Sequence, residues 1–181
     1  MIDPRGDLPT ASKEARAVKS HLGTWSVEEL ATAEATAEGV LDRLIDAELL
    51  HYIGHGKFSG FGGWDSSLLL ADETRLTLGD LLALERVPAW VVLSACETGR
   101  SSTGTPVETP GLAHAFLLAG SQAVVASTRP AKDREMPAFF ADLYDRWDDD
   151  ADLAVALQQA QLSWRKRNPE ADWQSFRLFV P

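Results

Sequence analysis

The chain has 181 residues, of which 45% are hydrophobic and 24% are charged, and its formal net charge is -10 at pH 7. This composition is typical of one globular domain that buries about 70% of its unfolded surface. The negative charge argues against a general nucleic-acid or anionic-membrane binder. No apolar run approaches the roughly 20 residues that span a bilayer. The first residues lack the apolar core of a secretory signal. A single cysteine cannot form an internal disulfide, so we expect a reducing, cytoplasmic location.

Apolar stripes and chain breakers divide the sequence into alternating helices and strands. Residues 1–9 are expected to form a strand remnant or the loop that leads into the fold. Helices are predicted over residues 10–22, 36–46, 77–84, 109–120, 136–147 and 153–164. Strands are predicted over residues 48–53, 67–71 (a hairpin or edge strand), 122–127 and 176–180, with another beginning at Trp90. This alternation favours an α/β fold with a mostly parallel sheet and helices on both faces.

Local signals mark several helix ends. Thr10 and Thr109 are predicted N-caps, and Thr77 with Asp80 fits a capping box. Gly120 fits the residue that follows a helix. The helix over residues 36–46 is predicted to face inward with Val40, Leu41, Leu44 and Ile45.

Cys96 and His55 are the residues that point to chemistry. Each follows an apolar run that predicts a buried strand, and 41 positions separate them, which is the length of one β-α-β unit. The carboxyl ends of neighbouring parallel strands collect functional groups at one edge of a sheet. Only a few per cent of a free thiol is ionised at neutral pH, and an adjacent imidazole can accept its proton. The pair therefore predicts a nucleophile and its general base.

Gly56 completes the predicted chemistry. A glycine lets its backbone N–H approach a substrate closely, so the N–H groups of Gly56 and Cys96 can form an oxyanion hole for acyl transfer. No metal or cofactor is required. Taken singly, Cys96 also reads as a small buried hydrophobe, and the Gly54-His55-Gly56 sequence as a tight turn.

Other polar residues give weaker signals. Lys57 is followed by Phe58 and not by serine or threonine, so a phosphate loop does not fit. Ser94 is not in a nucleophile elbow, and the histidines lack metal-ligand spacing. His51 is predicted to be a core residue. Core packing is also expected of Phe139, Phe140 and Tyr144.

The segments Leu50–Gly56, Val92–Gly99, Gly111–Gly120 and Trp173–Leu178 together resemble the CHAT family of caspase-like cysteine peptidases. The resemblance extends from Asp3 onward over nearly the whole chain. It implies the caspase-like (caspase–hemoglobinase) three-layer α/β fold, a dyad of His55 and Cys96, and endopeptidase activity on a protein or peptide substrate. It also implies that residues 100–109 form an activation or substrate-binding loop.

The resemblance carries further expectations about organisation and specificity. Residues 1–181 would form one CHAT domain that lacks the family's amino-terminal segment and belongs at the end of a longer protein. A sensor domain or partner protein would then regulate proteolysis. Glu97, Asp133 and Arg129 are the candidate substrate-binding residues. We expect Asp133 or Glu97 to favour a basic residue in the primary specificity pocket, and Arg129 stands where similar proteins often carry tryptophan.

The sequence leaves a second function open. A caspase-like fold also serves as a non-catalytic interaction or scaffold module, in which His55 and Cys96 would only contribute to packing, because a fold alone does not determine a function.

Overall fold

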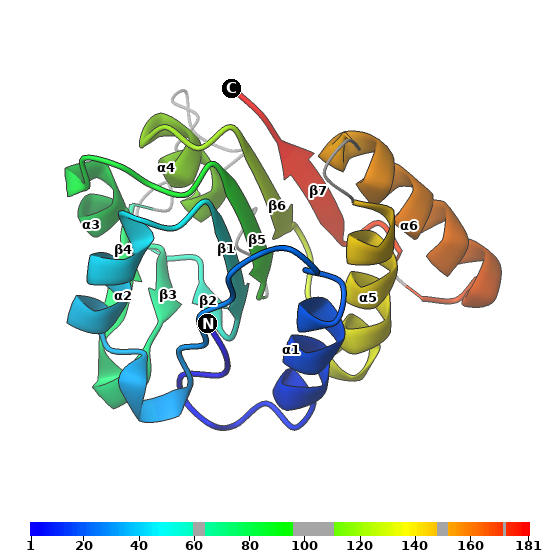
Figure 1. The fold of residues 1–181 in the computed structure, drawn as a ribbon, viewed down its shortest axis with the longest axis horizontal. Helices are drawn as coiled ribbons and strands as arrows, with labels where there is room; N and C mark the ends of the chain where they lie inside the picture. Colours follow the sequence, from blue (N-terminus) through cyan, green and yellow to red (C-terminus); the bar gives the residue numbers. More distant parts are fainter. Residues whose placement is uncertain (60–63, 96–110, 148–151, 172) are drawn as a thin grey trace.

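The structure is a computed structural model that describes residues 1–59, 64–95, 111–147, 152–171 and 173–181. A central sheet lies between two layers of helices (Figure 1). The helices are α1 (Ala11–Lys19), α2 (Ala37–Leu44), α3 (Leu78–Ala83), α4 (Leu112–Leu118), α5 (Met136–Arg146) and α6 (Leu153–Arg167). The strands are β1 (Leu49–Ile53), β2 (Gly56–Lys57), β3 (Ser67–Leu69), β4 (Arg75–Thr77), β5 (Trp90–Ser94), β6 (Ala123–Ser127) and β7 (Phe176–Phe179). Within the described ranges, no helix is both long enough and apolar enough to cross a membrane.

The main sheet has the strand order β1-β5-β6-β7. β5 pairs in parallel with β1 and with β6, whereas β7 runs antiparallel to β6. Every residue of β6 is buried, as are the four residues of β5 after Trp90. Strands that bury apolar side chains on both faces belong in the centre of a covered parallel sheet. The predicted, mostly parallel sheet is therefore confirmed.

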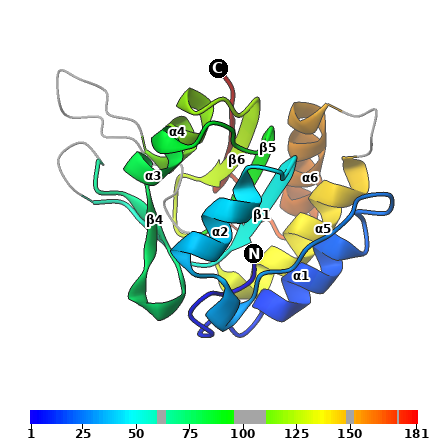
Figure 2. The same cartoon turned by 60° about the vertical axis from the view of Figure 1, so that its left-hand side comes forward.

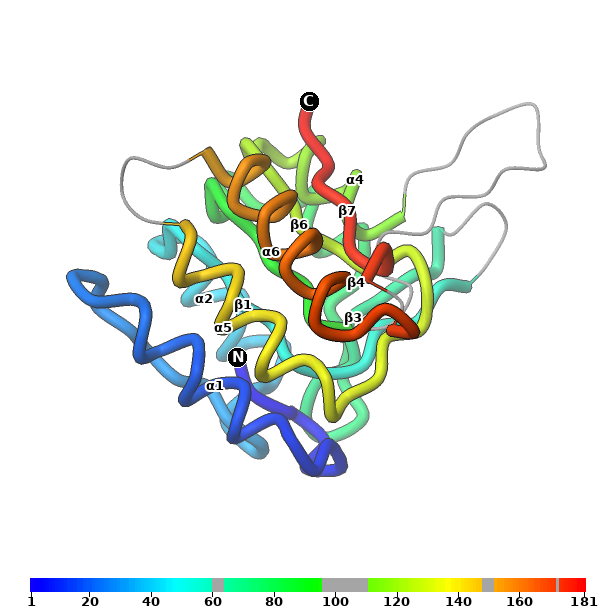
Figure 3. Tube along the Cα trace, turned by 90° about the vertical axis from the view of Figure 1, so that its right-hand side faces the viewer, coloured from blue at the N-terminus to red at the C-terminus, as the bar shows by residue number. Residues whose placement is uncertain are grey.

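Helices cover both faces of this sheet, as the sequence predicts. On one face, α2, α3 and α4 contribute side chains such as Leu44, Leu81 and Phe116 to a core that includes Tyr52 and Leu93 of the strands. On the other face, α1, α5 and α6 pack against the sheet residues Val92 and Val125. Figure 3 shows α5 between α1 and α6 in this second layer.

A smaller antiparallel sheet follows directly after His55. Its strand order is β2-β3-β4, with Gly56 opposite Leu68 and Leu68 opposite Leu76. β4 leads into α3 (Figure 2). The predicted capping box is present there, because Thr77 and Asp80 each bond the other's backbone N–H. The small sheet therefore holds the chain immediately after the end of β1.

Residues 1–3 form a short extended segment beside β1. Ile2 makes parallel bridges with Ile53 and Ala31. The Asp3 N–H donates to the Ile53 carbonyl oxygen at 2.8 Å, and the Ile53 N–H donates to the Met1 carbonyl oxygen at 3.0 Å. The predicted strand remnant is thus confirmed, and it lies on the side of β1 opposite β5.

Several local details differ from the prediction. The Thr10 side chain makes no capping bond to α1, because its hydroxyl donates to the Asp133 carbonyl oxygen at 2.8 Å. Ile45 is 41% exposed, because α2 ends at Leu44 and the inward stripe ends with it. α4 begins at Leu112, later than predicted, and Thr109 lies outside the described residues. Gly120 follows α4 as predicted, with φ of 115° in the region that favours glycine.

Candidate active site

The carboxyl ends of β1 and β5 lie side by side at one edge of the main sheet. Their register pairs Ile53 with Ser94, and the Gly54 N–H donates to the Ser94 carbonyl oxygen at 3.2 Å. His55 follows Ile53 by two residues, and Cys96 follows Ser94 by the same number. Cys96, Glu97 and the loop over residues 100–109 lie outside the described residues. The pairing of His55 with Cys96 therefore stays a prediction, which the register of the two strands favours.

The backbone of His55 is anchored by the buried side chain of Tyr52. The Tyr52 hydroxyl lies 3.0 Å from the His55 carbonyl oxygen and 2.7 Å from the Leu69 carbonyl oxygen. The Leu69 N–H also donates to the His55 carbonyl oxygen at 2.9 Å. Burial raises the pKa of Tyr52 well above its usual range, so the phenol stays a hydrogen-bond donor. The end of β1 is thereby tied to β3 next to the histidine.

Gly54 makes this anchor possible. A Cβ atom at this position would lie 2.4 Å from the Tyr52 hydroxyl oxygen, closer than van der Waals contact allows. The glycine before His55 is therefore required by the approach of the Tyr52 ring. In the Gly54-His55-Gly56 sequence, the first glycine serves this close packing.

The side chain of His55 contacts a carboxylate that the sequence pattern does not predict. Its Nε2 atom lies 2.7 Å from Oδ1 of Asp7, and the two side chains are 38% and 56% exposed. A carboxylate bonded to one ring nitrogen fixes the tautomer and orientation of an imidazole. Asp7 is 48 positions from His55, in the segment over residues 1–9 for which the sequence predicts only a strand remnant or a leading loop.

Asp3 organises the turn that presents Asp7. It is buried, with φ of 40°, and its two carboxylate oxygens accept from the N–H groups of Asp7 at 3.2 Å and Leu8 at 3.0 Å. An aspartate that bonds backbone N–H groups a few residues further on is a common turn signal. The spacing of Asp3 and Asp7 around Pro4 and Gly6 was the signal that could have identified this loop.

The N–H of Gly56, predicted to be an oxyanion donor, points away from the small sheet. Gly56 stands opposite Leu68, next to the bond from Leu69 N–H to the His55 carbonyl oxygen. Hydrogen-bonded and non-hydrogen-bonded pairs alternate along an antiparallel ladder, so Gly56 occupies a non-hydrogen-bonded position. Its N–H is thus not used by β3 and can meet another acceptor.

Asp133 and His55 both contact the short segment over residues 7–10. One Asp133 carboxylate oxygen accepts from the Thr10 N–H at 3.3 Å, while Asp7 at the other end of the segment reaches His55. Asp133 is half-buried, whereas Arg129 is exposed after β6. The roles predicted for both residues in substrate binding stay predictions.

His51 lies four residues before His55, and its side chain points toward α1 and α5. Its Nε2 is 3.0 Å from Oε1 of Glu14, and its Nδ1 is 2.9 Å from the Tyr144 hydroxyl oxygen. Burial lowers the pKa of His51, and the Glu14 carboxylate opposes this effect. Burial also raises the pKa of Tyr144 well above its usual range. His51 is therefore a core residue, as predicted, and the fully buried Glu14 is its unforeseen partner.

The described residues contain no group of three or more histidine, aspartate or glutamate side chains placed to hold a metal ion. The arrangement around His55 instead combines an imidazole, a carboxylate and an N–H that no strand partner uses. These groups suit proton transfer to and from a nucleophile, followed by stabilisation of an oxyanion.

Comparisons with known proteins bear on the fold and the family. Residues 3–179 match the sequence model of the CHAT domain family. No curated protein matches the chain. The complex of the pro- and mature domains of RgpB from Porphyromonas gingivalis is similar in structure, with a TM-score of 0.69 and 13% identity over 99% of this chain and 44% of that one. The structure of the Arg-specific cysteine proteinase gingipain R (RGPB) is also similar. Its TM-score is 0.65, and the sequences are 13% identical over 94% of this chain and 41% of the gingipain chain.

These structures establish the fold as the caspase–hemoglobinase-like fold of the gingipains, as the sequence resemblance predicts. The chain spans less than half the length of either gingipain chain.

Proposed function

The chain belongs to the CHAT family, and on this basis we propose that it is a cysteine endopeptidase with His55 and Cys96 as its catalytic dyad. The observation that carries the proposal is the paired carboxyl edge of β1 and β5, from which both residues follow at equal spacing. The similar fold of gingipain R, which is a cysteine proteinase by name, supports the same reading.

The proposed reaction is acyl transfer through a thioester. His55 removes the proton from the Cys96 thiol, and the thiolate attacks the carbonyl carbon of the scissile peptide bond. The oxyanion that forms accepts hydrogen bonds from the N–H groups of Gly56 and Cys96. The imidazolium then gives its proton to the leaving amine as the carbon–nitrogen bond breaks. Water, deprotonated by His55, hydrolyses the thioester and restores the thiol.

Asp7 gives His55 its orientation in this proposal. With Nε2–H donating to Asp7 Oδ1 at 2.7 Å, Nδ1 is the ring nitrogen left to accept the thiol proton. The carboxylate also stabilises the imidazolium that forms when the thiol is deprotonated. Asp7 is thus a positioning residue, and the buried Asp3 maintains the turn that presents it.

Specificity for a basic side chain is proposed for Asp133 or Glu97. The Asp133 carboxylate reaches the segment that carries Asp7, which supports a place beside the substrate. Cleavage profiling of Asp133→Asn, which keeps the acceptor for the Thr10 N–H, should lower the preference for lysine and arginine. An unchanged profile in both Asp133→Asn and Asp133→Ala would exclude Asp133 from the specificity pocket.

Regulation by a partner or sensor domain completes the proposal, with residues 100–109 as the activation or substrate-binding loop. RgpB, which has a similar fold, forms a complex of its pro- and mature domains, and this supports a polypeptide partner in the proposal. The single cysteine of the chain fits activity in the reducing cytoplasm.

A covalent inhibitor tests the dyad without knowledge of the substrate. Incubation with a peptidyl chloromethyl ketone should add one inhibitor mass at Cys96, located by peptide mass spectrometry, and His55→Ala should abolish the adduct. His21→Ala is the matched control, because His21 is an exposed histidine just after α1 whose Nδ1 lies 2.8 Å from the Ala17 carbonyl oxygen. A Cys96 that reacts equally in wild type and His55→Ala would favour the non-catalytic scaffold.

A further inference from the structure

The small sheet carries His55 and Lys57 on the same face. The Leu69 N–H donates to the His55 carbonyl oxygen, so His55 continues the ladder of β2 with β3, and Lys57 follows two positions later. Side chains two positions apart on a strand project from the same face, about 7 Å apart. The intervening row, which contains Leu68 and Leu76, packs into the buried core. His55 and Lys57 therefore lie on the outer face of the small sheet.

Arg75 belongs to the same outer face. The register places it opposite Leu69, which in turn stands opposite His55. Two strand spacings therefore separate the backbones of His55 and Arg75, which corresponds to about 10 Å. Lys57 and Arg75 thus lie in two directions from His55, one along its own strand and the other across the sheet.

A hollow of about 580 Å³ lies on the outer face and is lined by Lys57 and Arg75. Both cations are exposed, and neither forms a hydrogen bond or an ion pair with another described residue. One carboxylate, from Asp65, and the exposed ring of Trp64 also line the hollow. The two cations therefore leave an excess of positive charge here, in a chain whose formal net charge is -10.

Ser67 supplies a neutral donor between the two cations. It stands opposite Lys57 and diagonal to Arg75 in the register, and it lines the same hollow. The residue is buried, and its hydroxyl has no hydrogen-bond partner among the described residues. Most buried polar side chains have a partner, so this hydroxyl indicates a bond that a ligand oxygen can complete. Two cations and a hydroxyl donor together suit a carboxylate.

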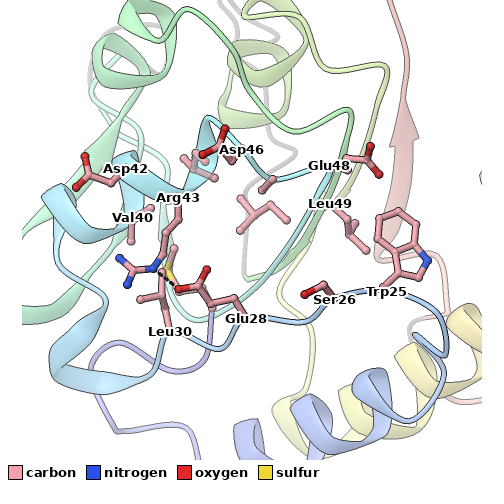
Figure 4. A pocket seen from close by; sticks show the side chains of 14 residues that line it. Trp25, Ser26, Glu28, Leu30, Val40, Asp42, Arg43, Asp46, Glu48 and Leu49 are labelled. Carbon is pink, nitrogen blue, oxygen red and sulfur yellow. Dashed lines mark hydrogen bonds and ion pairs between the residues drawn. The ribbon is translucent and has the colours of Figure 1, made fainter.

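The amino end of β1 has the opposite charge. Carboxylates line the pocket at that end, and its one guanidinium, that of Arg43, is bonded to Glu28 (Figure 4). The four carboxylates come from Glu28, Asp42, Asp46 and Glu48. An anionic ligand is therefore repelled from the amino end of β1 and attracted to the outer face of the small sheet, next to His55.

We propose that the outer face of the small sheet binds an aspartate or glutamate side chain of the peptide substrate, at the second or third residue after the cleaved bond. The inference rests on the proposed peptidase function, in which Cys96 holds the acyl half and His55 gives its proton to the leaving amine. The departing half of the substrate begins at that amine, so it extends from the histidine over the small sheet. An extended peptide advances about 3.3 Å per residue, and two or three residues span the distances from His55 to Lys57 and Arg75.

A tetrapeptide with glutamate at its second and third positions represents the departing half and tests the site directly. In an NMR titration of the wild-type chain, it should shift the amide resonances of Lys57, Ser67 and Arg75. Its dissociation constant should rise with salt, because salt screens exposed charges. The same peptide with glutamine in place of glutamate should cause none of these shifts.

Matched neutralisations locate the charge. Lys57→Gln and Arg75→Gln should each weaken binding of the glutamate peptide about twofold to fivefold. Arg86→Gln removes the same charge from an exposed arginine that does not line the hollow, and it should leave the dissociation constant unchanged. Equal effects of the three variants would overturn the proposal, as would equal binding of the glutamate and glutamine peptides.

Cleavage of a peptide library connects the site to the reaction. Peptides cut by the wild-type chain should be at least about twofold enriched in aspartate or glutamate at the second or third residue after the cut, and the double variant Lys57→Gln/Arg75→Gln should lose this enrichment. A uniform distribution at both positions would overturn the proposal. The chloromethyl ketone has no departing half, so its adduct at Cys96 reports the dyad alone. An adduct without acidic enrichment refutes this subsite and leaves the peptidase in place, whereas the absence of an adduct refutes the peptidase and the subsite with it.

Discussion

Replacing Tyr52 with phenylalanine removes a single oxygen atom from the interior beside His55. That hydroxyl lies 3.0 Å from the carbonyl oxygen of His55 and 2.7 Å from that of Leu69. The His55 carbonyl keeps its bond from the Leu69 N–H, but the Leu69 carbonyl loses the donor that the structure gives it.

The expected loss of stability follows from these hydrogen bonds. A buried acceptor left without its donor costs about 1–3 kcal/mol of unfolding free energy. For a chain of this size each kcal/mol shifts the melting temperature by about 2–4 °C, so a central loss of about 2 kcal/mol predicts a fall of about 4–8 °C. The aromatic ring stays, so no cavity term is added.

The same change should loosen His55. Its backbone would keep one of its two anchors, and displacement of a catalytic group lowers the population of the reactive geometry. We therefore expect the alkylation rate of Cys96 to fall about threefold to tenfold, which corresponds to about 0.7–1.4 kcal/mol. Because Cys96 is the only cysteine, its reaction with iodoacetamide reads out this site alone.

Tyr144→Phe is the matched control, since Tyr144 is the only other tyrosine and its buried hydroxyl also makes a hydrogen bond, to His51 at 2.9 Å. Both variants should lose similar stability in denaturant unfolding, but only Tyr52→Phe should slow alkylation at a temperature where both are folded. A Tyr52→Phe protein with wild-type stability, or equal slowing in the two variants, would refute the reasoning.

Three further predictions concern individual contacts. Asp7→Asn should slow Cys96 alkylation about tenfold at neutral pH with little loss of stability, because the pair with His55 is largely exposed, and Asp46→Asn should have no effect on the rate. Gly54→Ala should cost about 1–3 kcal/mol because its Cβ meets the Tyr52 hydroxyl at 2.4 Å, whereas Gly79→Ala, with its nearest contact at 3.6 Å in α3, should be neutral or stabilising in thermal unfolding. Burial lowers the pKa of His51, so the unfolded chain takes up a proton at a higher pH than the folded chain does. The free energy of unfolding should therefore fall as the pH drops below about 6.5, by up to about 1.4 kcal/mol per pH unit. Denaturant titrations from pH 8 to pH 5 should show this slope and its flattening in His51→Gln.

The strands were predictable because their burial follows from the apolar composition of short local segments. The apolar runs that begin at Trp90 and Ala123 match strands buried on both faces, and the run that begins at Leu49 matches β1, in which Leu50, Tyr52 and Ile53 are buried. The position of His55 at the end of β1 followed directly from this pattern.

The contacts made across long sequence separations were not predictable in the same way. The Asp7 carboxylate reaches His55 only because residues 1–3 pair with β1, a tertiary arrangement that no local periodicity encodes. Glu14 stands on the α1 face that packs against β1, where a stripe analysis expects an apolar residue, and its burial depends on the pairing with His51. The capping role assigned to Thr10 failed because its hydroxyl bonds Asp133, 123 positions away.

The endopeptidase proposal meets its most direct test in cleavage of a peptide library. The wild-type chain and Cys96→Ala, which differ only in the thiol, should be incubated in parallel with the same peptides from a denatured proteome, with and without the proposed partner or sensor domain. The account predicts new internal cleavage sites of one shared sequence pattern in the wild-type sample and none in Cys96→Ala. Identical peptide profiles for the two proteins under every condition would contradict it.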